Sequence, residues 1–133
     1  MSLQISTDPT RLDLDFIHTF LTQSYWAKNR SRETVATCIQ YSINFGVYLN
    51  GSQIGYARVV TDRAVFAYLM DLFIAGPHRG QGYAHELMTF ILKHESLQNI
   101  PTWHLATSDA HALYEKFDFT PLAFPEKMME RKV

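Results

Sequence analysis

An almost unbroken apolar run, Val65–Ile74, constrains the fold of this chain of 133 residues more than any other feature. Its β-branched and aromatic residues favour a strand that is buried on both faces. The one acid inside the run is Asp71, which needs a partner or a chemical task in such surroundings. Gly76–Pro77 ends the run and leads to a turn with two glycines, Arg79–Gly82. This order predicts a central strand that leads into a helix packed on the sheet.

A helix with one apolar face is expected after the turn. Its apolar residues stand at i, i+3, i+4, i+7 and i+8, namely Ala84, Leu87, Met88, Ile91 and Leu92. The first amides of such a helix have no intrahelical partner, and the helix dipole favours an anion beside them. Small residues let a ligand approach the backbone, and an arginine suits phosphate oxygens. The sequence therefore predicts a diphosphate site made by Arg79, Gly80, Gln81, Gly82, Tyr83 and Ala84.

Motif and composition argue against several other classes of protein. A dinucleotide fingerprint needs glycine where His85 stands, and the Gly-Lys-Ser/Thr of a P-loop is absent. The net charge of −1 provides no basic footprint for nucleic acid, and the apolar stretches are too short to span a membrane. The six histidines lack metal-ligand spacing, so no metal site is expected. The single cysteine, Cys38, cannot form an intrachain disulfide, which fits a cytoplasmic protein.

Periodicity and turn residues predict the other elements. We expect helices at Asp13–Gln23 and from Ser31 or Arg32 to about Tyr41, and strands at Gln4–Ser6, Phe45–Leu49, Gln53–Thr61 and Thr102–Thr107, with a tight turn at Asn50–Gly51. Ser108–Asp109 predicts the cap of a short helix that reaches Phe117, and Phe119–Val133 predicts two further short strands. The expectation is one α/β (α+β) domain over residues 1–133, with a mixed, mostly antiparallel sheet of about six to seven strands and helices on both faces.

Two blocks of the sequence match a known pattern at a known spacing. Arg79, Gly82 and Ala84 fit the motif Gln/Arg-x-x-Gly-x-Gly/Ala, placed between a strand and a helix. About thirty residues later, segment 106–119 contains a strand end and a short helix with a tyrosine, Tyr114. Together with the apolar strand before the turn, these blocks make the chain resemble the GNAT superfamily of N-acetyltransferases, whose acetyl-CoA-binding core is built this way.

Two positions depart from that family pattern. Asp109 stands where many members have asparagine, and its charge bears on contact with a cofactor. Asp118 replaces the usual glycine after the short helix. Aspartate tolerates a left-handed backbone better than most other residues, so we expect that conformation at Asp118.

The resemblance implies a fold, a cofactor and a reaction. It implies that the amine attacks acetyl-CoA directly in a ternary complex, so that a primary amine of a small molecule or peptide is acetylated. Backbone amides of the splayed strand, at Leu72, Phe73 and Ile74, would orient the thioester, and Asp109 and Tyr114 would also contact the cofactor. The alternative is a sensor or interaction module that binds acetyl-CoA on the same scaffold with little turnover.

Three side chains are candidates for proton transfer. Tyr114 is the candidate general acid, because a phenol with a pKa near ~10 can protonate a thiolate whose thiol pKa lies near ~8.5 once solvent is excluded. Asp71 is the first candidate base, because burial favours a carboxyl pKa nearer neutrality. His104, on the strand beside the expected cleft, is the second, since imidazole titrates near neutral pH. A chain of water molecules is the remaining option.

Candidate acceptor-binding residues come from a polar, aromatic loop and from one strand. Tyr25 and Trp26 lie in the loop, and Tyr56 and Arg58 lie on the strand. We expect the aromatic side chains to line an acceptor pocket and Arg58 to hold a carboxylate of the acceptor. The sequence allows a monomer or a homodimer and does not identify the amine.

Overall fold

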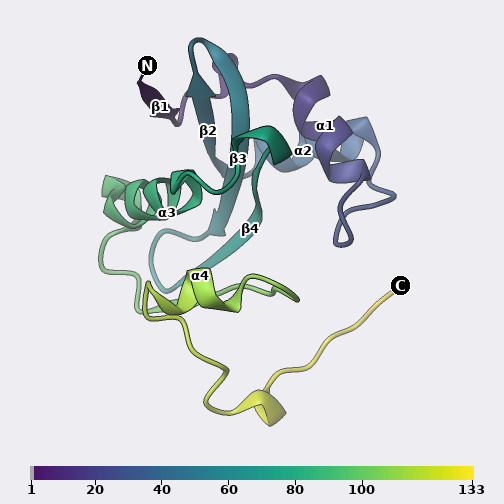
Figure 1. The fold of residues 1–133 in the computed structure, drawn as a ribbon. Helices are drawn as coiled ribbons and strands as arrows, with labels where there is room; N and C mark the ends of the chain where they lie inside the picture. Colours follow the sequence, from purple (N-terminus) through teal and green to yellow (C-terminus); the bar gives the residue numbers. More distant parts are fainter. Residues whose placement is uncertain (1) are drawn as a thin grey trace.

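The computed structural model describes residues 2–133 and contains one five-stranded sheet (Figure 1). The strands follow one another in chain order: β1 (Leu3–Ser6), β2 (Ile43–Leu49), β3 (Ser52–Thr61), β4 (Phe66–Ile74) and β5 (Thr102–His104). The first four strands pair antiparallel, and β5 pairs parallel to β4. The helices are α1 (Leu14–Thr22), α2 (Arg32–Gln40), α3 (Tyr83–Lys93) and α4 (His111–Glu115). This confirms the expected mixed, mostly antiparallel sheet.

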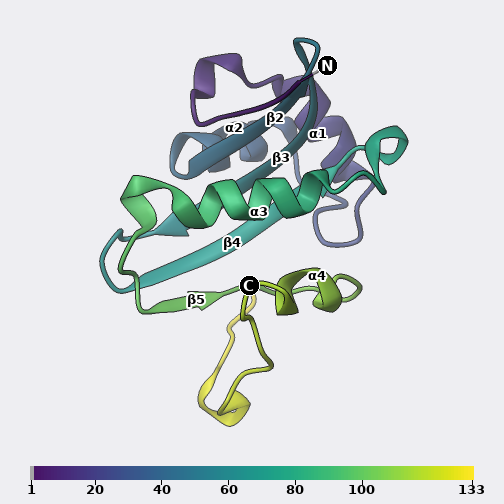
Figure 2. The same ribbon diagram turned by 60° about the vertical axis from the view of Figure 1, so that its left-hand side comes forward.

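Helices cover both faces of the sheet (Figures 1 and 2). α1 and α2 lie on one face and α3 on the other. A core cluster on the α3 side joins that helix to the strands through Phe45, Val47, Val59, Leu87, Met88 and Ile91. The cluster on the opposite face is formed by Ile17, Leu21, Ala27, Val35, Tyr56 and Phe73. The central strands are therefore buried on both faces, which explains why β4 reads as a continuous apolar run.

Local signals position most of the elements within one or two residues of the expectation. Asp13 and Ser31 cap α1 and α2, each accepting a hydrogen bond from the amide three residues later. Asn50 and Gly51, with φ of 52° and 82°, form the predicted two-residue hairpin turn. Asp118 has a φ of 70°, which confirms the left-handed backbone expected there.

A β-bulge interrupts the pairing of β3 with β4. Tyr56 pairs with Phe73, and Arg58 pairs with Met70, so that Asp71 and Leu72 together oppose Ala57. Asp71 adopts a φ of 56°, a left-handed conformation that aspartate tolerates better than most residues. A bulge bends its strand and increases the local twist. β4 pairs with β5 only over Phe66–Tyr68, before the bulge.

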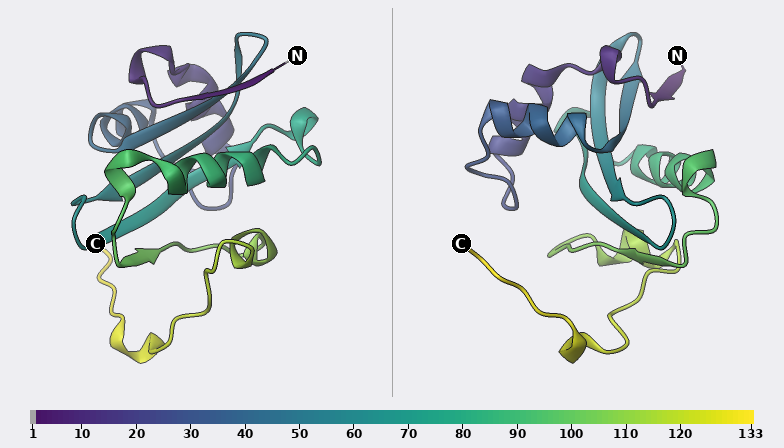
Figure 3. Two further views of the ribbon diagram at one scale, coloured as in Figure 1. Left: turned by 90° about the vertical axis from the view of Figure 1, so that its left-hand side faces the viewer. Right: turned by 180° about the vertical axis from the view of Figure 1, so that it is seen from behind.

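The C-terminal part corrects two expectations. The sheet of the described residues has five strands, fewer than the six to seven expected. Within 119–133 the structure contains a short 3-10 turn at Pro125–Lys127 and no strand, and residues 120–133 are exposed. The segment runs away from the sheet, as the views in Figure 3 agree. Pro121 and Pro125 explain this difference, because proline lacks the amide that a ladder needs.

The region between β5 and α4 also differs from the expectation. β5 ends at His104 and not at Thr107, and α4 begins at His111. No side chain caps α4 at its N-cap residue, Ala110, whose amide donates to Thr107 Oγ1 at 3.1 Å. The predicted Ser108–Asp109 cap is therefore wrong. No helix within residues 2–133 has the length and apolar character needed to cross a membrane.

Candidate active site

A cleft opens where β4 and the chain after β5 stop pairing. Its inner cavity, of about 210 Å³, lies between Tyr68–Leu72 on one wall and Leu105–Thr107 with Tyr114 on the other. Its outer cavity, of about 640 Å³, extends along the end of β4 to Arg79 and Ala84. The two cavities share the lining residues Tyr25, Trp26, Leu72, Asp109 and Ala110. They form one cleft that leads from the glycine turn to Tyr114.

The glycine turn presents bare backbone at one end of the cleft. Gly80 and Gly82 have φ of 78° and 81°, and a Cβ at either position would meet nothing within 4 Å. Gly82 is the N-cap residue of α3 and offers no side chain to its first amides. The first backbone bond of the helix is donated by Glu86 to the Gly82 carbonyl. The amides of Tyr83 and Ala84 are thus available to an anion.

Arg79 is anchored beside this turn. Its Nε donates to the Ile74 carbonyl at 3.0 Å, and its guanidinium carbon lies 5.9 Å from the centre of the Phe20 ring. No hydrogen bond within residues 2–133 engages its two Nη atoms. Arg79 therefore holds a fixed positive charge where the outer cavity meets the turn, and it fits a phosphate group there. His85, by contrast, packs against the Phe117 ring at 4.8 Å.

Asp71 lies at the bulge and is fully engaged by neighbours. Its side chain is 1% exposed, and its Oδ2 accepts from Arg30 Nη1 and Arg58 Nε, both at 2.7 Å. Trp26 Nε1 donates to Oδ1 at 2.9 Å. Charge-assisted hydrogen bonds of this kind satisfy a carboxylate that the fold has removed from water. The cluster ties the α1–α2 loop, β3 and β4 together at the bulge.

Tyr56 and Arg58, two of the predicted acceptor-binding residues, are buried behind this cluster. Tyr56 is 1% exposed, its hydroxyl donates to Asn44 Oδ1, and burial raises the pKa of its phenol. Arg58 donates Nη1 to Ser42 Oγ at 3.2 Å in addition to its contact with Asp71. The residues that line the cleft on this side are instead Trp26 and Arg30. Arg58 reaches the cleft only through Asp71.

Tyr114 lines the inner cavity from α4. It is 8% exposed, and burial, together with the nearby Tyr25 and Asp109, raises the pKa of its phenol to about 12. The phenol therefore remains protonated at neutral pH. No hydrogen bond within residues 2–133 engages its hydroxyl group. This leaves a proton donor at the inner end of the cleft.

His104 lies on the other side of the β5 chain. It pairs in register with Tyr68, and its ring meets the Phe66 ring edge-on at 5.3 Å. It lines a neighbouring cavity of about 340 Å³, together with Tyr114 and residues 119–122. The structure thus brings His104 near Tyr114 but not to Asp71.

The α1–α2 loop bridges the mouth of the cleft. The Tyr25 hydroxyl accepts a hydrogen bond from the Ser108 amide at 2.9 Å, across 83 residues of sequence. Tyr25 and Trp26 meet edge-on at 5.1 Å and line both cavities, in agreement with their expected place at a pocket. Arg30, from the same loop, was not predicted. No local pattern pairs it with Asp71, which lies 41 residues later.

Comparisons with known proteins agree with this architecture. The sequence model of the acetyltransferase (GNAT) domain matches residues 40–121. A crystal structure of a GNAT-family protein from Xanthomonas campestris is 43% identical, covers 100% of this chain and 94% of that chain, and superposes with a TM-score of 0.96. A Gibberella zeae protein named as a candidate acetyltransferase is 29% identical over 84% of this chain and 75% of its own length.

One more distant relative was crystallised with a cofactor. The acetyltransferase from Clostridium acetobutylicum, described with acetyl-CoA, is 13% identical, covers 98% of this chain and 95% of its own, and has a TM-score of 0.70. At that identity the likeness concerns the fold alone.

Proposed function

The chain belongs to the GNAT acetyltransferase family, and from that premise we propose that it transfers an acetyl group from acetyl-CoA to a primary amine. The reaction proceeds by direct attack in a ternary complex, in one domain that works in the cytoplasm. The observation that supports this proposal best is the continuous cleft from the open glycine turn to Tyr114. It has the two ends that the reaction needs, one for a diphosphate and one for proton donation.

In this proposal the outer cavity holds the cofactor. The turn residues Arg79, Gly80, Gln81, Gly82, Tyr83 and Ala84 bind the diphosphate through backbone amides and the arginine side chain. The backbone of Leu72, Phe73 and Ile74 orients the thioester, because β5 pairs only with Phe66–Tyr68 and leaves this part of β4 without a neighbouring strand on the cleft side among the described residues. Asp109 lines the outer cavity as well as the inner one, and Tyr114 lines the inner cavity, where the thioester end reaches it. The acetyl-CoA named for the Clostridium structure supports the choice of cofactor.

The chemistry requires few side chains, because a thioester is already activated. The amine nitrogen forms a bond to the acetyl carbon, the carbon–sulfur bond breaks, and the thiolate takes a proton. Tyr114 donates that proton, and holding both reactants in the cleft lowers the entropic cost of the step. The amine proton leaves through water, with His104 as the alternative acceptor. Asp71 acts as a positioning residue, because its carboxylate already accepts three hydrogen bonds.

Two measurements test this function. Calorimetric titration should detect binding of acetyl-CoA and none of ATP or NAD, since the turn lacks both nucleotide motifs. Release of free thiol from acetyl-CoA in the presence of a panel of amines should identify turnover, with product mass confirming one added acetyl group. Binding without thiol release for any amine would favour the sensor, and absence of acetyl-CoA binding would refute both.

A further inference from the structure

The side-chain cluster at the bulge has more positive than negative charge. Arg30 and Arg58 both contact Asp71, so two cations face one anion. The side chains are 16%, 7% and 1% exposed, in that order. Their other hydrogen-bond partners, Trp26 and Ser42, are neutral. Since charges are costly to keep out of water, the surplus favours an anion close by.

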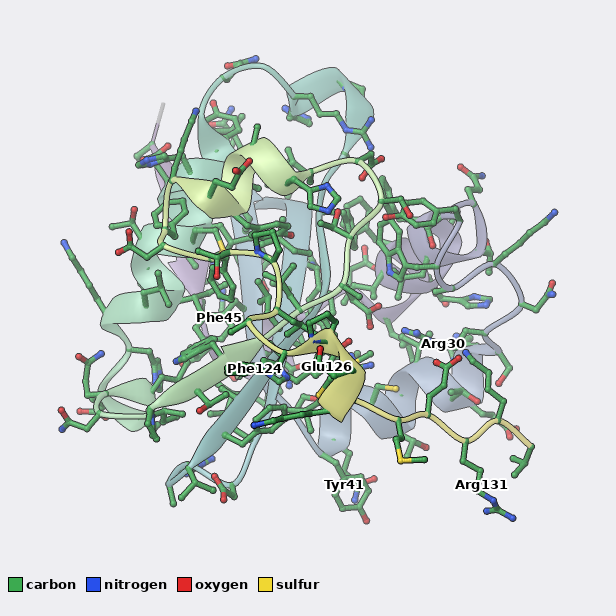
Figure 4. All side chains as sticks on the ribbon, turned by 90° about the horizontal axis from the view of Figure 1, so that it is seen from below. Arg30, Tyr41, Phe45, Phe124, Glu126 and Arg131 are labelled. Atoms are coloured by element: carbon green, nitrogen blue, oxygen red, sulfur yellow. The ribbon has the colours of Figure 1, made fainter. Side chains whose placement is uncertain are left out.

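The surplus charge is accessible at Arg30 and not at Arg58. Arg58 is buried and uses its Nε and Nη1 on Asp71 and Ser42. Arg30 uses only Nη1 within the described residues, and it lines the inner cavity. Arg30 lies just before α2, and its place on the domain can be followed in Figure 4. Its remaining donors form a planar group that suits a carboxylate.

The lining of the inner cavity also contains a negative charge apart from the bulge cluster. Besides Asp71, the acid in its lining is Asp109, which is exposed, belongs also to the outer cavity and acts electrostatically on Tyr114, whereas Arg30 lines the inner cavity and not the outer one. Hydrocarbon side chains of Leu69, Leu72, Leu105 and Leu113 also line the cavity. The volume of about 210 Å³ is below the roughly 300–1,000 Å³ of clefts for drug-sized ligands. A small ligand with separated charges fits this arrangement.

We propose that the acceptor is a small amino acid-like zwitterion whose carboxylate binds Arg30 and whose amine lies toward Asp109 and Tyr114. This substrate class rests on the proposed acetyl transfer and makes it more specific. A polyamine is disfavoured, because its second ammonium group would face Arg30. In this proposal Arg30, and not Arg58 as the sequence suggested, binds the carboxylate of the acceptor. Arg58 is buried and holds Asp71 in place.

Matched pairs of acceptors test the proposal. Thiol release from acetyl-CoA is measured with β-alanine against β-alaninamide and with glycine against glycinamide, with spermidine as the polycation. In each pair an amide replaces the carboxylate, which also makes the amine less basic. The amide form therefore has more of the reactive neutral amine near neutral pH, so a preference for the carboxylate form must come from the protein. We expect kcat/KM to favour the carboxylate by about ten- to hundredfold, mainly through KM.

Two variants locate the preference. Arg30→Gln should lower kcat/KM for the carboxylate form much more than for the amide form and so remove the preference, and Arg30→Lys should keep part of it, because the charge remains and the planar fork is lost. Arg32→Gln is the matched control, since Arg32 is exposed and pairs with the exposed Asp15. Thermal unfolding checks that the Arg30 variants stay folded, which Arg58 and Trp26 should ensure by holding Asp71.

The outcomes separate the two proposals. Equal rates for both members of each pair, or a preference that Arg30→Gln leaves intact, would overturn the zwitterion inference while acetyl transfer stands. Failure of every amine to release thiol from bound acetyl-CoA would overturn the proposed function and the inference with it. A carboxylate preference lost only in the Arg30 variants supports both.

Discussion

Two regions that border the cleft, the bulge within β4 and the glycine turn beyond its C-terminal end, differ in how their polar groups are satisfied. At the bulge, Asp71 is buried and accepts hydrogen bonds from three side chains. At the glycine turn beyond the strand, the first amides of α3 have no capping side chain, and Arg79 keeps both Nη atoms free of partners within residues 2–133. At the bulge the carboxylate of Asp71 is satisfied without a ligand, and Arg30 keeps further donors without a partner within the described residues. At the glycine turn the backbone amides and Arg79 have donors that only a ligand or water satisfies.

This difference teaches which conspicuous residues maintain the fold and which bind ligands. A single acid in an apolar strand, such as Asp71, is an obvious candidate for a catalytic group. Its hydrogen-bond partners instead show that it links the α1–α2 loop, β3 and β4. A glycine turn has few side chains and so offers few candidate catalytic groups, but its exposed amides can bind an anion. The two regions are distinguished less by their residue types than by whether their hydrogen-bonding groups already have partners.

The largest effect is expected from Asp71→Asn. Asparagine also tolerates the left-handed backbone, so the change removes charge while retaining shape, and it leaves two arginines without their counter-ion. The free energy of unfolding should fall by about 3–5 kcal/mol, as measured by denaturant titration. A variant of near wild-type stability that has lost the pH dependence of turnover would instead make Asp71 the base.

Tyr114→Phe should lower kcat by about a hundredfold or more, the usual contribution of a positioned acid, with little change in acetyl-CoA affinity. Timed assays of thiol release measure kcat, and calorimetry measures the affinity for acetyl-CoA. Tyr41→Phe, at an exposed tyrosine that follows α2 and lines neither cavity, is the control and should change neither. Unchanged turnover in Tyr114→Phe would remove the acid assignment.

The same phenol predicts a dependence of stability on pH. Its folded pKa of about 12 lies above the unfolded value near ~10, because burial favours the neutral form. The stabilisation is complete below about pH 10 and is lost as pH rises toward 12. Between these values, wild type should lose stability relative to Tyr114→Phe in thermal unfolding, and parallel curves would contradict the burial argument.

A smaller effect is expected from Gly82→Ala at the turn. The φ of 81° costs a residue with Cβ roughly 1–2 kcal/mol, so the turn should relax and acetyl-CoA should bind about tenfold more weakly. Gly51→Ala is a close control, because Gly51 has a φ of 82°, its Cβ would also meet nothing, and it lies in the hairpin. Equal losses of affinity in both variants would show that strain alone, and not the turn, governs binding.

The smallest effect is expected from Tyr25→Phe, which removes the bridge across the mouth. An exposed hydrogen bond contributes about 0.5–1.5 kcal/mol or less, so thermal stability should change little. The Ser108 amide should exchange its hydrogen faster, as followed by NMR. Protection that remains at Ser108 would mean that the bridge does not hold the two walls together.

Features encoded over a few residues were predicted well. The caps Asp13 and Ser31, the Asn50–Gly51 turn and the left-handed Asp118 depend on neighbouring atoms, and the glycine turn is equally local. The strands expected in Phe119–Val133 failed because a strand needs an edge to pair with, and local apolar residues cannot supply one. The strand count was too high for the same reason.

Features that depend on contacts between distant residues were not accessible from the sequence. The bulge follows from the register of β3 against β4, and the pairing of Arg30 with Asp71 follows from how the α1–α2 loop crosses the sheet. Tyr56 and Arg58 lie on the face that the Asp71 cluster and α1–α2 bury, so their polar groups pair inside the protein. Alternation along a strand assigns a face, but it does not tell what covers that face.

In the proposed complex, bare amides of the turn at Arg79–Ala84 bind the diphosphate of acetyl-CoA. An NMR titration of the labelled protein with acetyl-CoA, taken to the saturation that calorimetry establishes, tests this contact directly. We expect the amide signals of Gly80, Gly82, Tyr83 and Ala84 to shift together with those of Leu72 and Phe73, while the signal of Gly51 does not move. If the protein is saturated with acetyl-CoA and the amide signals of the turn have not shifted, the proposed diphosphate site is wrong.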